Sequence, residues 1–316
     1  MGKIAFLFPG QGSQQAGMGL ELSEMDTDVK ARFEEADSAL GEKLSSLIFE
    51  GPQDKLTHTA NAQPALLATS IAILEHFRKS GIEPDFVAGH SLGEYSALVA
   101  AGAFSFNEAV RTVRQRGELM EAAVPEGQGT MAAVLGLDRE RLSEVCRSVS
   151  GTGDVAELAN LNCPGQIVIS GSRKGVEAAS VLAKEAGAKR VLPLDVSGPF
   201  HSSLMKPAAS DLEKVLGKMD IRNAEIPVIA NVSAKPMLVA HDIKQNLIEQ
   251  LYSPVLWEDS VKKMIDEGVD TFIEIGPGKV LTGLVKKVDR SAKAFSVFDR
   301  QSHLAAVAAL KGDEQE

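Results

Sequence analysis

The sequence predicts an α/β protein: a large domain built around a parallel β-sheet, with a small α+β domain inserted into it. Two features of the 316 residues predict this fold class. Apolar strands, glycine-containing turns and helices alternate over residues 1–127 and again over residues 198–311, as in chains that form parallel sheets. Over residues 128–197 the order of elements changes. A hydrophilic stretch, residues 312–316, is expected to form a flexible tail.

The large domain opens with the apolar run of residues 3–8, which has the length of a buried strand and ends at Pro9 and Gly10. The remaining expected strands cover 85–88, 226–231, 271–275 and 294–298. Helices are expected over 29–40, 62–79, a stretch that ends near Gly102, a stretch that follows Ser105, and 243–251, 258–267 and 280–288. This repetition of strand and helix predicts one sheet covered on both faces.

The inserted domain is predicted from the order of its elements. Strands are expected over residues 130–137, 155–161, 166–170 and 189–196, and helices over 139–148 and 176–186. The resulting order, βαββαβ, is that of a ferredoxin-like unit. Residues 125–129 and the pair Gly198-Pro199 place glycine and proline at its two edges, where we expect hinges.

Composition and charge exclude several classes of function. With a net charge of −10 and no basic stripe, the chain is not expected to bind nucleic acid. The two cysteines, Cys146 and Cys163, form no CxxC pair and the six histidines are scattered, so we expect buried thiols and no metal site. The N-terminal apolar run is too short for a secretory signal, and no segment has the length of a membrane span. We therefore expect a cytoplasmic protein without membrane contact.

The sharpest chemical signal is the run Gly89-His90-Ser91-Leu92-Gly93, which has the pattern GxSxG. It follows a predicted strand and precedes a predicted helix, which is the context of the nucleophile elbow in α/β-hydrolase-like domains. Glycines two positions before and after the serine remove side chains that would collide in so tight a turn. The large domain is therefore predicted to be α/β-hydrolase-like, with Ser91 as its nucleophile.

A serine hydroxyl needs a neighbouring base, which is most often histidine. His90 is adjacent in sequence, but consecutive side chains diverge in an elbow, so we interpret it as a packing residue. His201 is the better candidate, because it lies between a predicted strand and an amphipathic helix. A helix N-terminus would disfavour the imidazolium and keep the ring ready to accept a proton. From the sequence pattern alone, a helix-capping or buried structural histidine is an equally good interpretation.

Arg116 lies on the apolar stripe of the helix predicted after Ser105, whereas Arg111 and Arg114 fall on its solvated face. A guanidinium among apolar residues is costly unless an anion meets it, and its planar fork suits a carboxylate. The partner is either an acidic side chain of the protein or the carboxylate of a ligand. Spacing alone does not decide between the two.

Two other glycine-containing loops do not match nucleotide-binding motifs. Gln15 stands where the third glycine of GxGxxG belongs, and Ile273 and Val280 break the Walker pattern around Lys279. Nucleotide binding is therefore not expected. A glycine-flanked turn at a strand end can instead offer backbone N–H groups to a developing oxyanion.

Six motifs occur in order along the chain: FPGQGSQ at residues 8–14, GHSLGE at 89–94, RQRG at 114–117, NCPGQIVISG at 162–171, GPFH at 198–201 and EIGPGKVL at 274–281. With them the chain resembles, over nearly its full length, the malonyl-CoA:acyl carrier protein transacylases of bacterial type II fatty acid synthesis. The resemblance implies transfer of a malonyl group from coenzyme A to the phosphopantetheine thiol of acyl carrier protein, through a malonyl-serine ester. It also implies that no metal and no bound cofactor are needed.

The resemblance further implies a role for each matching residue. Ser91 would attack the thioester, and His201 would act as general base and then as general acid. Arg116 would bind the free carboxylate of the malonyl group. The backbone N–H groups of Gln11 and Leu92 would hold the oxyanion.

In this family the histidine is oriented by a backbone carbonyl, and the matching position here is Gln250, so the site would be a dyad. The residues implied along the acyl and pantetheine channel are Gln63, Asn160, Asn162, Gln166 and Phe200. Phe200 would also crowd an α-methyl branch on the acyl group. The expected partners are acyl carrier protein and a coenzyme A thioester, and the expected oligomeric state is a monomer.

Two other classes of function fit parts of the pattern. A serine hydrolase would also use GxSxG and a histidine, with an acid between them in chain order, and Asp195 is the nearest candidate acid. A noncatalytic carrier-docking module would keep the fold without the chemistry.

The negative net charge of the chain affects how an acyl carrier protein could dock. Acyl carrier proteins are acidic, so an acidic chain needs a local basic patch to receive one. Lys189-Arg190 and Lys286-Lys287 with Arg290 are the candidate patches, and we expect at least one of them near the mouth of the Ser91 site.

Overall fold

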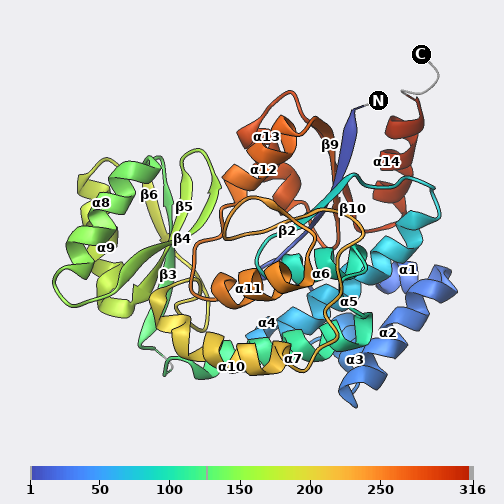
Figure 1. Ribbon diagram of the computed structural model, residues 1–316, viewed down its shortest axis with the longest axis horizontal. Coiled ribbons are helices and arrows are strands. Elements are labelled where there is room, and N and C mark those ends of the chain that lie inside the picture. The colour runs from blue at the N-terminus through green and yellow to red at the C-terminus, as the bar shows by residue number, and fades with distance from the viewer. Residues whose placement is uncertain (1, 126, 313–316) are drawn as a thin grey trace.

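The computed structural model describes residues 2–125 and 127–312 as a large and a small unit, each with its own sheet (Figure 1). The chain builds the first part of the large unit, passes through the small unit at the left of Figure 1, and returns to complete the large one. Both ends of the chain lie on the same side of the large unit (Figure 1). The predicted mixed α/β class with a parallel sheet is confirmed.

Six strands form the sheet of the large unit, in the order β10-β9-β1-β2-β7-β8. Their bounds are β1 Lys3–Phe8, β2 Phe86–Gly89, β7 Val228–Ile229, β8 Pro236–Met237, β9 Val269–Ile275 and β10 Lys293–Val297. All neighbouring pairs are parallel except β7 and β8, which run antiparallel. The carboxyl ends of β1, β2, β7 and β9 therefore meet at one edge, where parallel sheets usually place their ligand sites.

Helices cover both faces of this sheet. They are α1 Leu20–Met25, α2 Thr27–Leu40, α3 Leu44–Glu50, α4 Gln53–Thr57, α5 Thr59–Arg78, α6 Leu92–Ala100, α7 Phe106–Ala122, α10 Lys206–Leu216, α11 Ala240–Gln250, α12 Trp257–Asp266, α13 Val280–Val288 and α14 Arg300–Gly312. A short 3-10 turn, Ser203–Met205, precedes α10.

Strand β1 is buried on both faces, as its uninterrupted apolar sequence requires. Ile4, Phe6 and Phe8 enter a core that they share with α2, α5, α6 and α7. Ala5 and Leu7 point to the opposite face, into a second core that contains the apolar residues of α12 and α13. The period of two along a strand thus divides one apolar run between two helical layers.

The small unit contains β3 Gly129–Leu135, α8 Arg139–Ser150, β4 Ala156–Cys163, β5 Gln166–Ser172, α9 Arg173–Glu185 and β6 Arg190–Pro193. Its sheet has the order β4-β5-β3-β6, and every neighbouring pair is antiparallel. One face of this sheet packs on α8 and α9. The other face contributes Met131, Ala159 and Val168 to the core of the large unit.

The two units are also joined through their backbones. Asn160 of β4 forms a parallel bridge with Val255, which precedes α12. The N–H of Leu161 donates to the carbonyl of Val255 at 2.9 Å, and the N–H of Val255 donates to the carbonyl of Ala159 at 2.8 Å. Strand β4 is therefore held against the large unit at the place where its side chains reach the candidate site.

The structure differs from the predicted elements in length and number. Strand β7 covers two residues of the expected 226–231, and β6 covers four of the expected 189–196. Helices α1, α3 and α4 were not predicted, because segments of five to seven residues are too short to show helical periodicity. Helix α14, whose alanine-rich sequence gives no clear apolar stripe, was also missed. The expected tail begins at Gly312, which is the last residue of α14, and residues 313–316 lie outside the described residues.

Three predictions concern features of the whole chain. Cys146 and Cys163 are both buried free thiols, as expected. Within residues 2–125 and 127–312, no helix is long and apolar enough to cross a membrane. The same part of the chain contains no cluster of three histidine, cysteine or acidic side chains that could hold a metal ion.

Candidate active site

Ser91 occupies the turn between β2 and α6, with φ 52° and ψ −107°, a conformation that residues with a side chain rarely adopt. The flanking glycines allow this turn to pack. A Cβ on Gly89 would lie 1.9 Å from the backbone of Gly93, and a Cβ on Gly93 would lie 2.0 Å from the carbonyl oxygen of Phe8. The GxSxG pattern is therefore a packing requirement, and it leaves the serine at the start of a helix.

Asn231, which follows β7, holds the elbow from behind. Its Oδ1 accepts a hydrogen bond from the backbone N–H of Ser91 at 2.7 Å, and its Nδ2 donates to the carbonyl of Gly89 at 2.7 Å. The side chain is buried. Asn231 was not among the predicted site residues, although a polar side chain directly after a buried parallel strand is a signal that could have indicated it.

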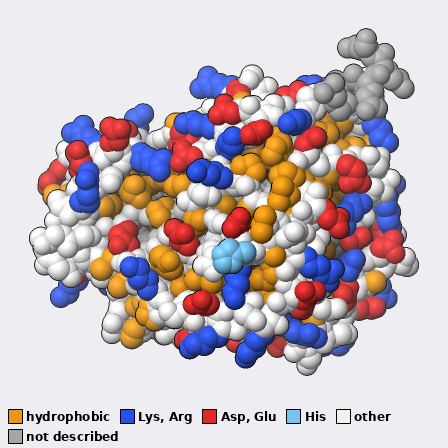
Figure 2. Space-filling model, viewed as in Figure 1, with side chains coloured by type: hydrophobic (Ala, Val, Ile, Leu, Met, Phe, Trp, Pro, Cys, Tyr) orange, Lys and Arg blue, Asp and Glu red, His pale blue; other side chains and the backbone are white. Residues whose placement is uncertain are grey.

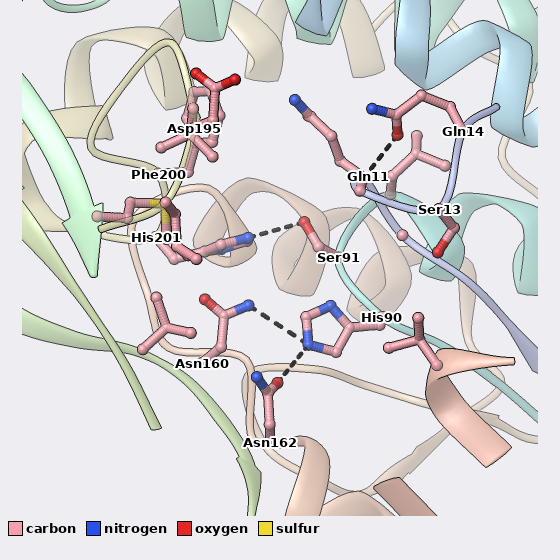
Figure 3. Close-up of a pocket in the computed structure, with 18 of the residues that line it drawn as sticks. Gln11, Ser13, Gln14, His90, Ser91, Asn160, Asn162, Asp195, Phe200 and His201 are labelled. Atoms are coloured by element: carbon pink, nitrogen blue, oxygen red, sulfur yellow. Dashed lines mark hydrogen bonds between the residues drawn. The ribbon is translucent and has the colours of Figure 1, made fainter. Parts of the chain in front are cut away.

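His201 lies directly opposite Ser91, and the two side chains point toward one another (Figure 3). The Oγ of Ser91 is 2.8 Å from Nε2 of His201, and Nδ1 of His201 is 2.8 Å from the backbone carbonyl of Gln250. Because a carbonyl only accepts hydrogen bonds, Nδ1 of the neutral ring carries the proton. Nε2 is then left to accept the proton of the serine hydroxyl.

Burial keeps the His201 ring neutral. The side chain is 3% exposed, and desolvation, with the nearby Arg116 charge, lowers its pKa to about 3. His201 has a positive φ of 60° and lies two residues before the 3-10 turn Ser203–Met205, which leads directly into α10. The expected position just before an amphipathic helix therefore agrees with the structure. The low pKa has burial as its largest cause, followed by the Arg116 charge.

Arg116 reaches the same site from α7, where its side chain is 1% exposed. Its Nη1 donates to Oε1 of Gln63 at 2.8 Å, and its Nη2 donates to Oε1 of Gln250 at 2.8 Å and to Oγ of Ser91 at 3.3 Å. All three acceptors are uncharged, and Nε has no hydrogen-bond partner among the described residues. The internal salt bridge that spacing allowed is therefore absent from these contacts. A buried guanidinium with neutral acceptors is suited to receive an anion.

Two glutamines support this guanidinium. Gln250 at the end of α11 is fully buried and touches Arg116 with its side chain and His201 with its backbone. Gln63 of α5 is also fully buried, and it is not among the residues that line the cavity. The prediction of a channel position for Gln63 was therefore wrong, because Arg116 lies between Gln63 and Ser91 and binds both.

Ser91, His201 and Arg116 open into a cavity of about 320 Å³ between the two units (Figure 3). Gln11 and Leu92 also line it. The N–H of Leu92 begins α6, and within the described residues no hydrogen bond is found from the backbone N–H of either residue. The two predicted oxyanion residues thus lie in the same cavity as the predicted nucleophile.

The loop of Gln11 is pressed against the elbow. A Cβ on Gly10 would lie 2.3 Å from the carbonyl oxygen of His90, so only glycine permits this approach. The side chain of Gln11 donates to Oγ1 of Thr59 at 3.0 Å, which holds the loop from the other side. The close approach explains why the first strand ends in a glycine-containing loop.

The other predicted channel residues lie on the opposite wall. Asn160, Asn162, Gln166 and Phe200 line the cavity. His90 also points into it, and its Nε2 lies 2.9 Å from Oδ1 of Asn162 (Figure 3). His90 makes no contact with the hydroxyl of Ser91, so its predicted packing role agrees with its position. Further apolar residues line the cavity: Met120, Met131, Val168, Leu194, Val196, Val280, Leu281 and Leu284.

Asp195 lines the outer part of the cavity but is exposed, and its carboxylate points away from the His201 ring (Figure 3). The Nδ1 atom that a triad acid would bind is occupied by the carbonyl of Gln250. The geometry is therefore that of a dyad and not that of a Ser-His-Asp triad.

Residues 5–310, nearly the whole chain, match the acyl transferase domain. The chain belongs to the acyl transferase domain family. It is 64% identical over 311 residues to the malonyl CoA-acyl carrier protein transacylase of Bacillus subtilis, an alignment that covers 98% of each chain. The resemblance stated from six motifs is thereby confirmed.

Solved structures agree with this assignment. The acyl carrier protein S-malonyltransferase of Vibrio cholerae superposes with a TM-score of 0.94 and is 48% identical, with coverage of 96% of this chain and 99% of that one. A malonyl-transacylase solved in complex with its type II PKS acyl-carrier protein superposes with a TM-score of 0.95 at 44% identity, covering 97% and 99% of the two chains. This acyl transferase therefore shares the fold of both enzymes.

Proposed function

We propose that this acyl transferase moves a malonyl group from malonyl-CoA to the phosphopantetheine thiol of an acyl carrier protein, in fatty acid biosynthesis. One observation carries the proposal: the Ser91–His201 pair lies beside a buried guanidinium, that of Arg116, whose Nη2 is 3.3 Å from the nucleophilic oxygen. A dyad alone serves many acyl groups, but a buried cation at this distance favours an acyl group with a carboxylate. The relatives, a malonyl CoA-acyl carrier protein transacylase and an acyl carrier protein S-malonyltransferase, agree with this substrate.

The first half-reaction forms an ester. Oγ of Ser91 attacks the thioester carbonyl carbon of malonyl-CoA while its proton passes to Nε2 of His201. The negative charge that develops on the carbonyl oxygen is held by the backbone N–H groups of Gln11 and Leu92. When the C–S bond breaks, His201 returns the proton to the departing coenzyme A thiolate, which leaves as the thiol.

The second half-reaction reverses these steps with a different thiol. The phosphopantetheine thiol gives its proton to Nε2 of His201 and attacks the ester carbonyl. Collapse of the tetrahedral intermediate breaks the C–O bond, and the proton moves from His201 to Oγ of Ser91. The free serine and malonyl-carrier thioester result. The steps use only one thioester, malonyl-CoA, and one thiol, that of the carrier's phosphopantetheine arm, with no metal and no bound cofactor.

Arg116 would hold the malonyl group in place during both half-reactions. Its guanidinium binds the free carboxylate, and Asn160, Asn162, Gln166 and Phe200 line the path of the acyl chain and the pantetheine arm. A narrow site between the two units limits the access of water, which would otherwise hydrolyse the ester. Phe200, which is buried beside His201, would crowd an α-methyl branch.

The rate of Ser91 acylation is expected to stay constant between about pH 5 and pH 8. A base must be neutral to accept a proton, and because the pKa of His201 is lowered to about 3, the ring is neutral over this whole range. Acid therefore slows acylation only as the pH falls toward that pKa. Single-turnover release of coenzyme A from malonyl-CoA measures the rate. A fall centred near the ordinary histidine pKa of about 6.5 would contradict this account.

A serine hydrolase is the second candidate, because it shares the elbow and the histidine. Asp195→Asn separates the two functions. In a dyad oriented by the carbonyl of Gln250, this change is expected to leave kcat/KM for malonyl transfer within about twofold, since Asp195 does not bind His201. A triad would instead lose about 10⁴-fold in kcat. Steady release of malonate by the unaltered enzyme, without transfer to a carrier, would also favour the hydrolase.

The docking patch for the carrier is proposed on α13. Lys287 donates to Oε1 of Gln166 at 2.8 Å, and Gln166, Leu281 and Leu284 line the cavity, so this helix lies at its mouth. Basic and acidic side chains alternate over the face shown in Figure 2, which leaves short local patches rather than a stripe. We therefore place the acidic carrier next to Lys286-Lys287 and Arg290.

Charge reversal tests this patch. Lys286→Glu combined with Arg290→Glu is expected to raise the KM for the carrier about tenfold at low salt and to leave acylation by malonyl-CoA unchanged. Lys214→Glu on α10, which lies at the opposite edge of the molecule in Figure 1, is the matched control. An unchanged KM for the carrier in the double variant would remove this patch from the docking surface.

The proposed function is tested by measuring the mass of the acyl carrier protein before and after the reaction. Malonyl-CoA, the enzyme and a phosphopantetheine-loaded acyl carrier protein are mixed, and the intact carrier mass is measured. A gain of one malonyl group that needs the enzyme supports the proposal, and acetyl-CoA should yield far less product. Free malonate together with an unmodified carrier would contradict the proposed transfer and leave only the assignment to the acyl transferase domain family.

Several finer assignments are proposed with this function. The strand–elbow–helix arrangement supports an α/β-hydrolase-like large domain, and the sheet order β4-β5-β3-β6 with two helices on one face supports a ferredoxin-like small domain. The proposed boundaries are residues 1–127 with 198–311, and 128–197. We further propose a cytoplasmic monomer.

A further inference from the structure

Glu94 lies directly behind the nucleophile, in the first turn of α6, and is fully buried. Its Oε2 accepts hydrogen bonds from Nε2 of Gln250 at 2.7 Å and from the backbone N–H of Asn231 at 3.2 Å. Its Oε1 has no hydrogen-bond partner among the described residues. Removing a carboxyl group from water is costly, so a buried acid in this position calls for an explanation. The sequence analysis noted Glu94 only as the last letter of GHSLGE.

The side chain of Gln250 connects this acid to the rest of the site. Its Nε2 donates to Oε2 of Glu94 and, at 3.0 Å, to the backbone carbonyl of Ser91. Its Oε1 accepts from Nη2 of Arg116 at 2.8 Å. The backbone carbonyl of the same residue accepts from Nδ1 of His201. One residue thus touches the nucleophile, the base and the guanidinium together.

The orientation of the Gln250 amide decides whether these contacts are possible. An amide can turn by half a rotation and exchange its oxygen and its nitrogen. In the turned state the NH₂ group would face Arg116, which has only donors, and the oxygen would face the carboxyl of Glu94. The contact with Arg116 would then be lost, and so would the contact with Glu94 as long as its carboxyl is ionised. Glu94 supplies the acceptor that stabilises the observed orientation of the Gln250 amide.

Glu94 can supply that acceptor in either protonation state. Burial raises its pKa to about 7, so the acid is partly protonated near neutral pH. The proton can reside on Oε1, which no other group binds, and Oε2 remains an acceptor for Gln250. The contact therefore depends on an oxygen at this position and not on a negative charge.

We propose that Glu94 is a positioning residue that acts through the side-chain amide of Gln250 to hold Arg116 and the Ser91 elbow in their working geometry. The part that concerns Arg116 rests on the proposed malonyl specificity. The part that concerns Ser91 does not, because the elbow would need the same support for any acyl group.

Three variants test the acceptor role. Glu94→Ala removes the acceptor and is expected to slow acylation by malonyl-CoA about 30- to 100-fold, as small displacements of reacting groups do. Glu94→Gln keeps an oxygen there and is expected to remain within about threefold of the unaltered enzyme. If a thermal melt shows that Glu94→Ala does not fold, Glu94→Leu, whose side chain has a similar volume, is tested in its place. A slow glutamine variant, or a fast alanine variant, would overturn the proposal.

A matched control separates positioning from folding. Asp37 of α2 is another buried acid, which accepts from Ser45 and Lys43, far from the cavity lining. Asp37→Ala is expected to lower the melting temperature and leave the acylation rate per active molecule unchanged. The ratio of malonyl to acetyl acylation is a second readout, because a smaller folded fraction lowers both rates equally. Glu94→Ala should lower this ratio, and an unchanged ratio in a slow variant would contradict the link to Arg116.

A double-mutant cycle tests the route through Gln250. Because both residues act through one amide, Glu94→Ala added to Gln250→Ala is expected to slow acylation by no more than about threefold beyond Gln250→Ala alone. Additive effects would show that Glu94 acts by another path.

A fluorophosphonate that labels reactive serines makes the test independent of malonyl-CoA. Its rate constant with Ser91 should fall at least tenfold in Glu94→Ala and be restored in Glu94→Gln. If the unaltered enzyme forms no malonyl ester, the proposed function fails and this rate still tests the role of Glu94. An unchanged labelling rate in Glu94→Ala would overturn the positioning of the elbow.

Discussion

Replacing Ser91 by Ala is expected to lower kcat/KM for malonyl transfer by about 10⁴-fold or more, which is the largest single effect we predict. The covalent path disappears with the hydroxyl, because within residues 2–125 and 127–312 Oγ of Ser91 is the side-chain hydroxyl that lies against Nε2 of His201, at 2.8 Å. Only binding and the oxyanion N–H groups then remain to assist a direct transfer between thiols. Intact-mass measurement after brief exposure to malonyl-CoA should show an added malonyl group on the unaltered enzyme and none on Ser91→Ala.

The serine variant is expected to fold normally. The positive φ at this position penalises alanine and serine alike, and the lost contacts are the hydrogen bonds of the hydroxyl with His201 and Arg116. A melting temperature close to that of the unaltered enzyme would show that the loss is chemical. A malonyl adduct that persists in Ser91→Ala would place the nucleophile elsewhere and contradict the mechanism.

Replacing Arg116 by Ala is expected to lower kcat/KM for malonyl-CoA by about 100-fold or more, while that for acetyl-CoA stays level or rises. The buried cation attracts the malonyl carboxylate and disfavours a neutral acyl group, so its removal reverses both effects. Acylation rates with malonyl-CoA and acetyl-CoA in competition measure the selectivity directly. Equal selectivity before and after the change would remove Arg116 from substrate recognition.

Arg114 provides the matched control for this change. It lies on the same helix, pairs with Glu42 on the outside of the molecule and does not line the cavity. Arg114→Ala should leave selectivity unchanged. Arg116→Lys should restore only part of the malonyl preference, because a lysine ammonium cannot reproduce the planar fork that reaches Gln63 and Gln250 together.

Much of the site was predictable because short sequence patterns carry it. A Cβ on either glycine beside Ser91 would lie about 2 Å from backbone atoms, so only glycine fits and the elbow can be recognised from five residues of sequence. Arg116 was visible as a charge on an apolar helical stripe. Strand β1 could be predicted equally well, since a strand that is buried on both faces is apolar throughout.

The supporting residues were not predictable in the same way. Asn231 and Glu94 act through contacts with residues 137 to 156 positions away in the chain, and such separations leave no local pattern. The misplacement of Gln63 has the same origin, since its role depends on how α5 lies against α7. The low pKa of His201 also follows from burial by distant segments and not from its neighbours in sequence.

The sequence by itself determined the α/β class, the nucleophile elbow and the presence of a buried arginine, because backbone packing and hydrophobic periodicity act over a few residues. Only the tertiary structure decided what surrounds Arg116, which side chains support the Ser91 elbow and where the cavity lies. Those answers depend on the meeting of β2, α7, α11 and the small sheet, which are far apart along the chain and are brought together by burial of the apolar core.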